Sequence, residues 1–343
     1  MDRPRAEEPI DVSVILPVLN EERDIGRLLG QLLEQAPPPG GFEILVADGG
    51  STDATRAIVT GLCAKHPTLK LLDSPGRRAA AGRNVGFRAA RGRFVLFVDG
   101  HCAVPRQDYL IRTVELFEST GTDCLARPQP LDHLARGAWP MAIAAARHSW
   151  LGHNYPSDIY GGPPGFTNPR SAGAAYRRAC LEQLGGFDER FDTCEDVEFN
   201  HRLAKAGFRS YRHPDLAVHY RPRSSLRELY RQMFRYGTGR ARLFRTHSRT
   251  VPWPLVLLTA FLLLVAATFV AFGRAVGMLT LLVPIAAWLV LVVAESLRAS
   301  TTETKAWRVM IALFVIYIGL TLGFWLGMAA SSWSLRRVGT GCP

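Results

Sequence analysis

The sequence predicts an α/β domain with an open, mostly parallel central sheet, followed by a membrane region. Two observations support this fold class. Short β-rich runs alternate with segments of helical periodicity over about the first hundred residues, and this alternation favours parallel strands joined by right-handed crossovers. After Trp253 the chain contains three long, almost uncharged apolar runs, each long enough for the roughly 30 Å hydrocarbon core of a bilayer.

The alternating segments can be placed in order. Four strands are expected, at residues 11–17, 42–47, 68–72 and 93–98. Asn20 is expected to cap the first helix, with Glu21 and Glu22 in its favourable first turn. Further helices are expected at about 52–64, 83–90 and 130–150. The segment 154–169, rich in Gly, Pro and Tyr, is typical of a binding lid.

Polar clusters stand where three of the expected strands end. They are "PVLNE" (17–21), "DGGSTD" (48–53) and "DGH" (99–101). Ligands of open parallel sheets bind beyond the carboxyl ends of the strands, so these clusters could be turns, a metal site or a catalytic group. A dinucleotide site is excluded because no G-x-G-x-x-G follows a strand, and a calcium loop is excluded because Val59 stands at the twelfth position.

The charge of the chain indicates a membrane partner. The formal net charge is +11, which is compatible with nucleic acid, anionic lipid or a phosphorylated ligand. Residues 221–250 hold nine arginines against one glutamate, directly before the apolar runs, and a basic segment in that place favours anionic lipid head groups. Nucleic acid is not expected, because the front part lacks a basic face interleaved with aromatic residues.

The apolar runs, at about 254–272, 276–294 and 308–330, predict about three transmembrane helices with tryptophans near their ends. Three spans would carry Arg336 and Arg337 across the membrane, against the positive-inside bias, so one run could be re-entrant. The expected domains are 1–220, a basic interfacial segment 221–250, and a membrane domain 251–343. The N-terminus has no apolar signal core, and six cysteines without a C-x-x-C pair suit a reducing compartment. A multi-pass protein of the inner (plasma) membrane with a cytoplasmic catalytic domain is therefore expected.

The motifs together resemble a known family. In order they are "SVILPVLNEE", "LVADGGSTDAT", "FVDGHC", "GGFDERF", "CEDVEFNHRL" and "RQMFRYG". Over about residues 12 to 240 the chain resembles family 2 glycosyltransferases with the GT-A fold. The "DGH" and "RQMFRYG" spellings look most like membrane-associated glucosyltransferases of succinoglycan-type exopolysaccharide synthesis.

The resemblance implies a donor site at the strand ends. Asp48 would contact uracil and ribose, and Pro17, Asn20, Glu21 and Gly50 would line the same end. The alternative for Asp53 is a turn and cap role. Asp99 would hold a divalent metal, Mn²⁺ or Mg²⁺, directly or through the ribose. His101 would be a second metal ligand or a donor to a phosphate oxygen, and His219 would complete the metal shell unless it is structural.

The resemblance also implies a base and a diphosphate contact further along the chain. Asp196 would be the general base, with Glu195 in a supporting role; the alternative is that both cap a helix. Arg83, followed by Asn84, resembles a basic position that reaches the nucleotide, or is structural. Gln232, Arg235 and Tyr236 resemble a Q-x-x-R-W signature that contacts the diphosphate and the acceptor, although they could also form an interfacial amphipathic helix.

The function implied is an inverting, metal-dependent transfer of a hexose, with glucose the expected sugar, from a UDP-sugar to a saccharide on a polyprenyl diphosphate lipid. Three alternatives remain open. The first is a processive polysaccharide synthase, and the second is a polyprenyl-phosphate sugar synthase whose acceptor phosphate needs little deprotonation. The third is an inactive, membrane-anchored sugar-binding subunit.

Overall fold

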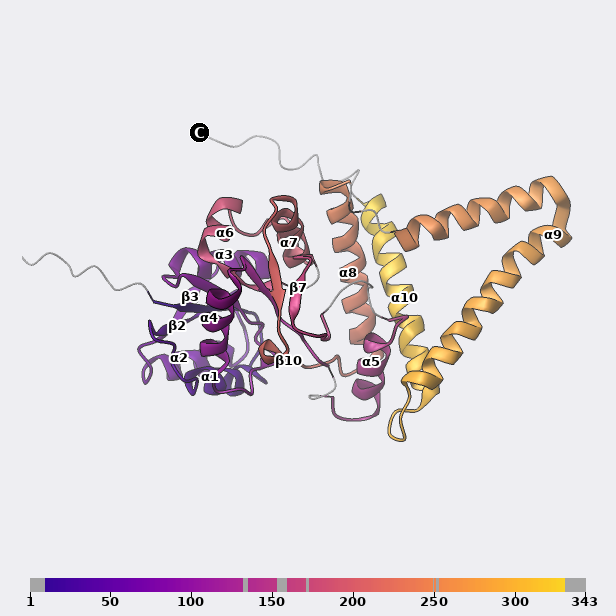
Figure 1. Cartoon of the computed structure of the whole chain (residues 1–343). Helices are drawn as coiled ribbons and strands as arrows, with labels where there is room; N and C mark the ends of the chain where they lie inside the picture. The colour runs from indigo at the N-terminus through magenta and orange to yellow at the C-terminus, as the bar shows by residue number, and fades with distance from the viewer. Residues whose placement is uncertain are drawn as a thin grey trace, which may run out of the picture. The chain divides into compact units, whose positions relative to one another are not determined.

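The computed structural model describes residues 10–131, 135–152, 159–170, 173–248, 250 and 253–330. These residues form two compact units (Figure 1). The first unit contains the described residues up to 131 and those from 159 to 221, and the second contains 135–152 and those from 222 onward. The sequence-based boundaries place 135–152 in the catalytic domain, whereas its contacts lie within the second unit. The first residues of the expected lid, 154–158, lie outside the described residues.

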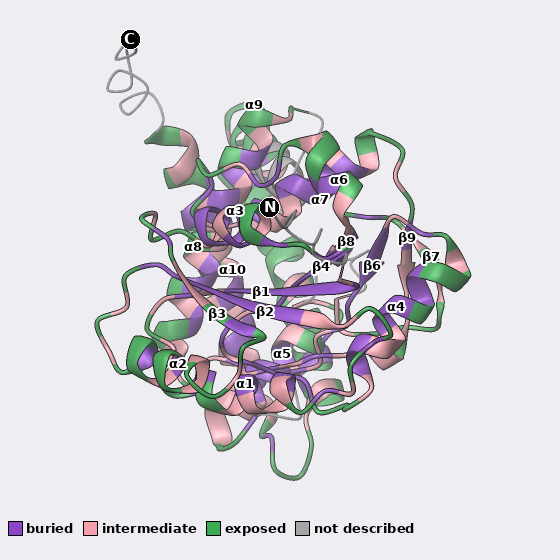
Figure 2. Ribbon diagram, turned by 90° about the vertical axis from the view of Figure 1, so that its left-hand side faces the viewer, coloured by how far each residue is buried: buried purple, intermediate pink, exposed green. Residues whose placement is uncertain are grey.

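The first unit is built on an eight-stranded sheet with the strand order β3-β2-β1-β4-β8-β6-β9-β7. Strands β1 to β4 are mutually parallel, and β8 joins β4 in the antiparallel direction. Figure 2 shows these strands as the buried centre of the unit. The predicted α/β fold with a mostly parallel sheet is confirmed. The strands are β1 (Val12–Val18), β2 (Phe42–Asp48), β3 (Leu69–Asp73), β4 (Phe94–Phe97), β6 (Cys124–Ala126), β7 (Gly165–Thr167), β8 (Gly173–Arg177) and β9 (Ser210–Arg212).

Helices cover both faces of this sheet, with α1 and α2 on one side and α3, α6 and α7 on the other (Figure 2). Helix α1 buries Ile25, Leu28, Leu29 and Leu32, which recur at helical spacing. Helix α3 can approach β1 closely because Gly86 has no side chain; a Cβ at this position would collide with Ile15. The helices are α1 (Ile25–Leu33), α2 (Thr55–Cys63), α3 (Ala79–Ala89), α4 (Tyr109–Thr120), α6 (Arg178–Leu184), α7 (Glu195–Lys205) and the 3₁₀ turn η1 (Pro214–Leu216).

The predicted cap of the first helix is wrong. Helix α1 begins at Ile25 after Asp24, and Asn20 lies four residues earlier with a left-handed backbone, φ 57°. Asparagine tolerates this conformation because its short side chain can hydrogen-bond locally. Asn20, Glu21 and Glu22 therefore belong to a loop beyond the end of β1 and not to a helix.

The second unit consists of α5 (Ala138–His148), α8 (Leu226–Thr246), α9 (Trp253–Ala299) and α10 (Ala306–Ala329). Two of these helices are long and apolar enough to cross a membrane, α9 from Leu263 to Ala299 and α10. Helix α9 bends at Gly273, where φ is +78° and the backbone is not helical (Figure 1). This break falls between the first two expected apolar runs, and the number of membrane crossings remains a prediction.

Candidate active site

The predicted donor-site residues of the first unit gather beyond the carboxyl ends of β1, β2 and β4. The register aligns Val18 of β1 with Asp48 of β2, and Ile15 of β1 with Phe97 of β4. The three polar clusters that follow these strands therefore emerge at the same edge of the sheet. This is the edge at which open α/β sheets bind their ligands.

The first part of the site surrounds Asp48. Its carboxylate is buried and accepts hydrogen bonds from the Ser51 hydroxyl at 2.5 Å and from the Arg56 guanidinium at 3.2 Å. Gly50 has φ +85°, a left-handed conformation that favours glycine. Arg56 also pairs with Asp73 at 2.7 Å, and both of these side chains are substantially exposed. Asp48 is thus held in place from within the protein, at the end of a strand.

The loop after β1 is fastened to the loop after β2. The Asn20 amide donates to the Ser51 hydroxyl at 2.9 Å, and the Asn20 side-chain oxygen accepts from the Thr52 amide at 2.8 Å. The Glu21 amide donates to the Thr55 hydroxyl at 2.7 Å. These bonds use the backbone of Glu21 and leave its carboxylate to interact with other groups.

Asp53 has a structural role in this loop. Its carboxylate accepts from the amides of Thr55 at 3.0 Å and Glu22 at 3.1 Å. This is the turn and cap role that the sequence analysis left open as the alternative.

The Glu21 carboxylate reaches His101. The two are joined at 2.9 Å through His101 Nδ1, and the Tyr220 ring packs edge-on at 4.8 Å between centroids. Gly100 makes room for this contact, because a Cβ there would lie 2.8 Å from Glu21 Cγ. Burial lowers the pKa of His101, but Tyr220, the bond to Glu21 and the charge of Asp99 outweigh it and raise the pKa to about 10. His101 Nε2 is buried and makes no hydrogen bond with any residue that the structure describes.

Asp99 is bound to Arg83, which is itself buried. One guanidinium nitrogen of Arg83 donates to Asp99 at 3.2 Å, and another donates to Glu195 at 2.6 Å. Burial raises the pKa of the Asp99 carboxyl, but the charges of Arg83, His101 and Arg127 outweigh it and lower the pKa below its ordinary value. Asp99 is therefore ionised at neutral pH.

Arg83 thereby connects two parts of the chain that the sequence keeps far apart. It lies on α3, and its guanidinium stacks over the Phe187 ring at 5.4 Å from the centroid. Burial lowers the pKa of Arg83, but Glu195, Asp99 and Asp196 together raise it above the ordinary value. The predicted contact of Arg83 with the nucleotide is untested, whereas its ion pairs with two carboxylates are part of the structure.

Glu195 and Asp196 begin helix α7. The preceding residue, Cys194, has a left-handed backbone with φ 63°, which is uncommon for a residue with a side chain and costs energy. Burial raises the pKa of Glu195, an effect that Arg83 opposes and the neighbouring Asp196 reinforces. Asp196 is only partly buried. Glu195 thus faces inward to Arg83, while Asp196 keeps some access to solvent.

Arg127 is a residue of this site that sequence reasoning missed. It is buried just after β6, and its guanidinium donates to the Phe97 carbonyl at 2.6 Å, at the end of the strand that leads to Asp99. No motif marks it, because an isolated arginine between short strands has no distinctive pattern. The sequence offers only the short apolar run Cys124–Ala126 directly before it, which is too short to be distinctive.

His219 lies on a short strand, β10 (His219–Tyr220), which pairs with β5 (Cys102–Ala103). The register places His219 opposite Ala103, so β10 runs beside the chain that leaves the "DGH" cluster. Within the described residues, however, no three His, Cys, Asp or Glu side chains are placed to hold a metal ion together. The predicted place of His219 in a metal shell therefore stays a prediction.

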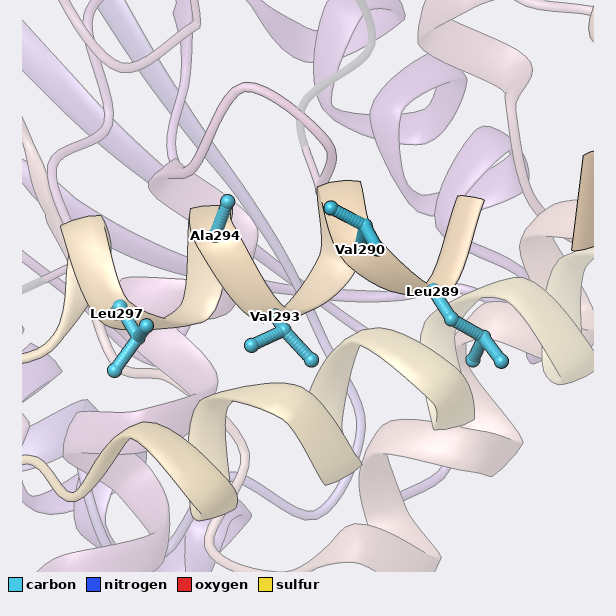
Figure 3. A pocket seen from close by; sticks show the side chains of 5 residues that line it. All are labelled: Leu289, Val290, Val293, Ala294 and Leu297. Atoms are coloured by element: carbon cyan, nitrogen blue, oxygen red, sulfur yellow. The ribbon is translucent and has the colours of Figure 1, made fainter. Parts of the chain in front are cut away.

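Gln232, Arg235 and Tyr236 lie on α8 in the second unit. Gln232 is buried and its amide donates to the Tyr236 hydroxyl at 3.4 Å, while Arg235 is exposed. The predicted roles of these residues at the diphosphate and the acceptor remain predictions. Figure 3 shows a groove elsewhere in this unit, on α9, lined by Leu289, Val290, Val293, Ala294 and Leu297. These aliphatic side chains offer no group for chemistry.

Comparisons with known proteins identify the class of the chain. Residues 13–185 match the family model described as glycosyl transferase family 2. The succinoglycan biosynthesis protein ExoA of Rhizobium meliloti is 30% identical over 318 residues, which cover 91% of this chain and 93% of that protein. The chain therefore belongs to glycosyltransferase family 2 and is a glycosyltransferase, as its motifs predicted.

A second relative and a solved structure extend this result. The Methanococcus voltae protein is named dolichyl N-acetyl-alpha-D-glucosaminyl phosphate 3-beta-D-2,3-diacetamido-2,3-dideoxy-beta-D-glucuronosyltransferase. It is 27% identical over 92% of this chain and 97% of that protein. The mannosyltransferase PcManGT from Pyrobaculum calidifontis, solved with GDP-Man and Mn²⁺, has a TM-score of 0.57 at 22% identity, covering 93% of this chain and 90% of that one. This likeness shows the GT-A fold.

Proposed function

We propose that this glycosyltransferase moves a hexose, with glucose the expected sugar, from a UDP-sugar to a lipid-linked saccharide, with inversion at the anomeric carbon. The observation that carries the proposal is the Asp99–Arg83–Glu195 bridge. It ties the carboxylate of the "DGH" cluster to the start of the helix that carries Asp196. A donor-side carboxylate and a candidate base are thereby held at one edge of the sheet.

Asp196 is the general base in this proposal. Its carboxylate accepts the proton of an acceptor hydroxyl while the hydroxyl oxygen forms a bond to C1 of the donor sugar. The bond between C1 and the diphosphate breaks on the opposite face, and UDP leaves. Glu195 is not the base, since its carboxylate is buried and paired with Arg83; it positions the start of α7. Asp48 holds the uridine end, together with Pro17, Asn20 and Gly50.

A divalent metal, Mn²⁺ or Mg²⁺, fits the residues around Asp99. Such ions are often held by one or two protein side chains together with the phosphates of the substrate. Asp99 supplies an ionised carboxylate. His101 presents an unpaired Nε2 while Nδ1 faces the Glu21 carboxylate, the arrangement in which histidine commonly binds metals. A bound metal would stabilise negative charge on the departing diphosphate. Without one, protonated His101 would donate to a phosphate oxygen.

The acceptor is proposed to be a saccharide on a polyprenyl diphosphate at the cytoplasmic face of the plasma membrane. Two apolar helices and the arginines of α8 support a position at the bilayer. Two relatives are named for succinoglycan biosynthesis and for transfer to a dolichyl-linked sugar phosphate. Both names fit a glycan that is built on a membrane lipid.

A donor panel tests this proposal. Membranes containing the full chain are incubated with short polyprenyl-diphosphate-linked saccharides, individual UDP- and GDP-sugars, and either Mn²⁺ or Mg²⁺, and nucleoside diphosphate release is measured. We expect release from UDP-glucose that depends on both acceptor and metal, with one sugar added per acceptor. Consumption of no UDP-sugar with either metal would overturn the proposal. Long products would indicate a processive synthase, and transfer to bare polyprenyl phosphate would indicate a polyprenyl-phosphate sugar synthase.

A further inference from the structure

Helices α8 and α10 pack in parallel along three glycines spaced four residues apart. A Cβ at Gly319 would lie 2.8 Å from the Met233 Cβ, and one at Gly327 would lie 2.9 Å from the Ala241 Cβ. Between them, a Cβ at Gly323 would collide with the backbone of Phe234. Small residues at this spacing let two helix backbones approach closely. The two helices therefore run in the same direction and lie side by side along most of α8.

Helix α8 carries a stripe of arginines at that level. Arg227, Arg231, Arg235, Arg242 and Arg245 are all exposed, and their spacing places them on one face of the helix. The buried face contains Leu229, Met233, Gly237 and Ala241. If α10 crossed the membrane, Arg231 and Arg235 would be held beside its middle, at the depth of the hydrocarbon core. Charged side chains in that position are costly and rare.

An irregular segment also meets the middle of α10. The Tyr317 hydroxyl donates to the Leu151 carbonyl at 2.9 Å, in the turn that follows α5. A Cβ at Gly152 in the same turn would lie 3.2 Å from Leu313 Cδ2. Backbone outside helices does not occur in contact with lipid hydrocarbon, because its polar groups would lack partners. The turn at Leu151 is therefore unsuited to contact with the hydrocarbon of a bilayer.

Helix α9 meets the same turn and α10 only near its end. There Glu295 accepts from the Trp150 amide at 2.7 Å, and Trp288 packs against Tyr317 at 5.5 Å between ring centroids. Most of the α9 side chains that the structure describes are nevertheless exposed.

The two arms of α9, 253–272 and 274–299, have lengths of about 30 and 39 Å at 1.5 Å per residue, so each arm can cross a bilayer. Large apolar side chains project from both arms, including Val270 (89% exposed), Phe272 (69%) and Leu297 (63%). The bend at Gly273 places Arg274 at the tip of the pair and not in the middle of a span.

We propose that the chain crosses the membrane twice, with both crossings made by α9, and that α8 and α10 lie on the bilayer surface on the side of the catalytic unit. The exposed apolar face of α10, which includes Ile318, Leu322 and Trp325, contacts the boundary of the acyl chains. The α8 arginines face anionic lipid phosphates. The C-terminal residues Arg336 and Arg337 then return to the side of the other arginines, in agreement with the positive-inside bias. This topology does not depend on the identity of the donor sugar.

Cysteine labelling of the full-length protein tests this topology. The background carries Cys63→Ser and Cys342→Ser and keeps four buried cysteines, Cys102, Cys124, Cys180 and Cys194. One accessible cysteine is introduced at a time as Ala275→Cys at the bend, as Thr302→Cys between α9 and α10, or as an extra residue after Pro343. Lys65→Cys, on the exposed surface of the first unit, is the matched control. Spheroplasts of the producing cells are treated with a membrane-impermeant maleimide before and after permeabilisation.

We expect Ala275→Cys to be labelled in sealed spheroplasts, and the other three positions to be labelled at least tenfold more after permeabilisation than before. Labelling of the C-terminal cysteine from outside would show that α10 crosses the membrane. Labelling of Thr302→Cys from outside would show that α9 crosses only once, and protection of Ala275→Cys would show that α9 does not cross. Each of these three results would overturn the proposal.

Discussion

The site contains two carboxylate networks that differ in burial. Asp48 is paired with Ser51 and with Arg56, whose side chain is about half exposed. Asp99, in contrast, is paired with Arg83, which is buried and has a second ion pair with Glu195. Ion pairs near solvent are weak and easily exchanged, whereas buried ones are costly to break. This difference is compatible with the proposed roles, reversible nucleotide binding at Asp48 and a fixed geometry around Arg83.

The largest effect on activity is expected from substitution of Asp196, the neighbour of Glu195 in the Arg83 network. Asp196→Asn removes the proposed base, and kcat for transfer to a saccharide hydroxyl should fall by on the order of 10³-fold. The dissociation constant of the UDP-sugar should be unchanged, because Asp196 does not bind the donor. Steady-state kinetics and calorimetric titration measure the two quantities, with Glu182→Gln as the surface control. Nearly full activity in Asp196→Asn would argue for an acceptor that needs no deprotonation.

The second test removes the centre of the buried network. Arg83→Met leaves the buried Glu195 and the partly exposed Asp99 without their common cation, so the free energy of unfolding should fall by about 3 kcal/mol. Adding Glu195→Gln should recover part of this loss, since one uncompensated charge is then removed. Thermal unfolding of the purified full chain in detergent follows both variants. If Arg83→Met unfolds like the wild type, the Asp99–Arg83–Glu195 bridge does not organise the site.

A smaller effect is expected at the candidate metal site, where Glu21 contacts His101. Glu21→Gln weakens the partner of His101 Nδ1 and should reduce Mn²⁺ affinity in the presence of UDP by about 10- to 100-fold. Glu22→Gln is the matched control, because Glu22 contacts the Ala54 amide and not His101. Titration calorimetry with Mn²⁺ measures the affinity. Equal affinities in the two variants would instead favour a protonated His101 that binds phosphate.

The pH dependence of stability tests whether His101 is protonated in the folded protein or is neutral and able to bind a metal. Its pKa in the metal-free protein is raised to about 10, above the ordinary value of 6.5. The contribution of protonated His101 to the free energy of unfolding is therefore complete below about pH 6.5 and is lost as the pH rises through 10. The melting temperature of the metal-free protein should decline over this range, and less steeply in His101→Gln. Parallel slopes for the two proteins would show that His101 is not protonated in the folded state.

The smallest effect is expected in the exposed network. Arg56→Met removes an ion pair that solvent screens, so it should change the free energy of unfolding by less than about 1 kcal/mol. The KM for the UDP-sugar should change more than kcat does. A loss of stability as large as that of Arg83→Met would remove the distinction between the two networks.

The sequence predicted the sheet because strands and helices depend on local pattern, and its periodicities placed β1 to β4 closely. The three polar clusters emerge at one edge of the sheet, and their role as the donor site stays a prediction. The predicted helix cap at Asn20 is wrong because the Asn20 side chain accepts a hydrogen bond from Thr52, which is distant in sequence. The ion pair between Arg83 and Glu195 joins residues 112 positions apart, and no local pattern encodes such a contact.

The membrane unit shows the same limit. Composition alone makes α9 and α10 equivalent candidates for crossing a bilayer. Their difference comes from tertiary contacts. Helix α10 packs against α8 along its glycines and contacts the turn at Leu151, whereas α9 meets that turn and α10 near its end and exposes large apolar side chains elsewhere along both arms. Hydropathy counts apolar residues but does not register which of them already have protein neighbours.

The anomeric configuration of the product tests the central claim most directly. A single displacement assisted by Asp196 inverts C1, whereas a covalent intermediate would retain its configuration. We predict that NMR of the first product formed from an α-linked UDP-sugar will show a β-linked sugar on the lipid-linked acceptor. An α-linked product would contradict direct displacement and the assignment of Asp196 as the base.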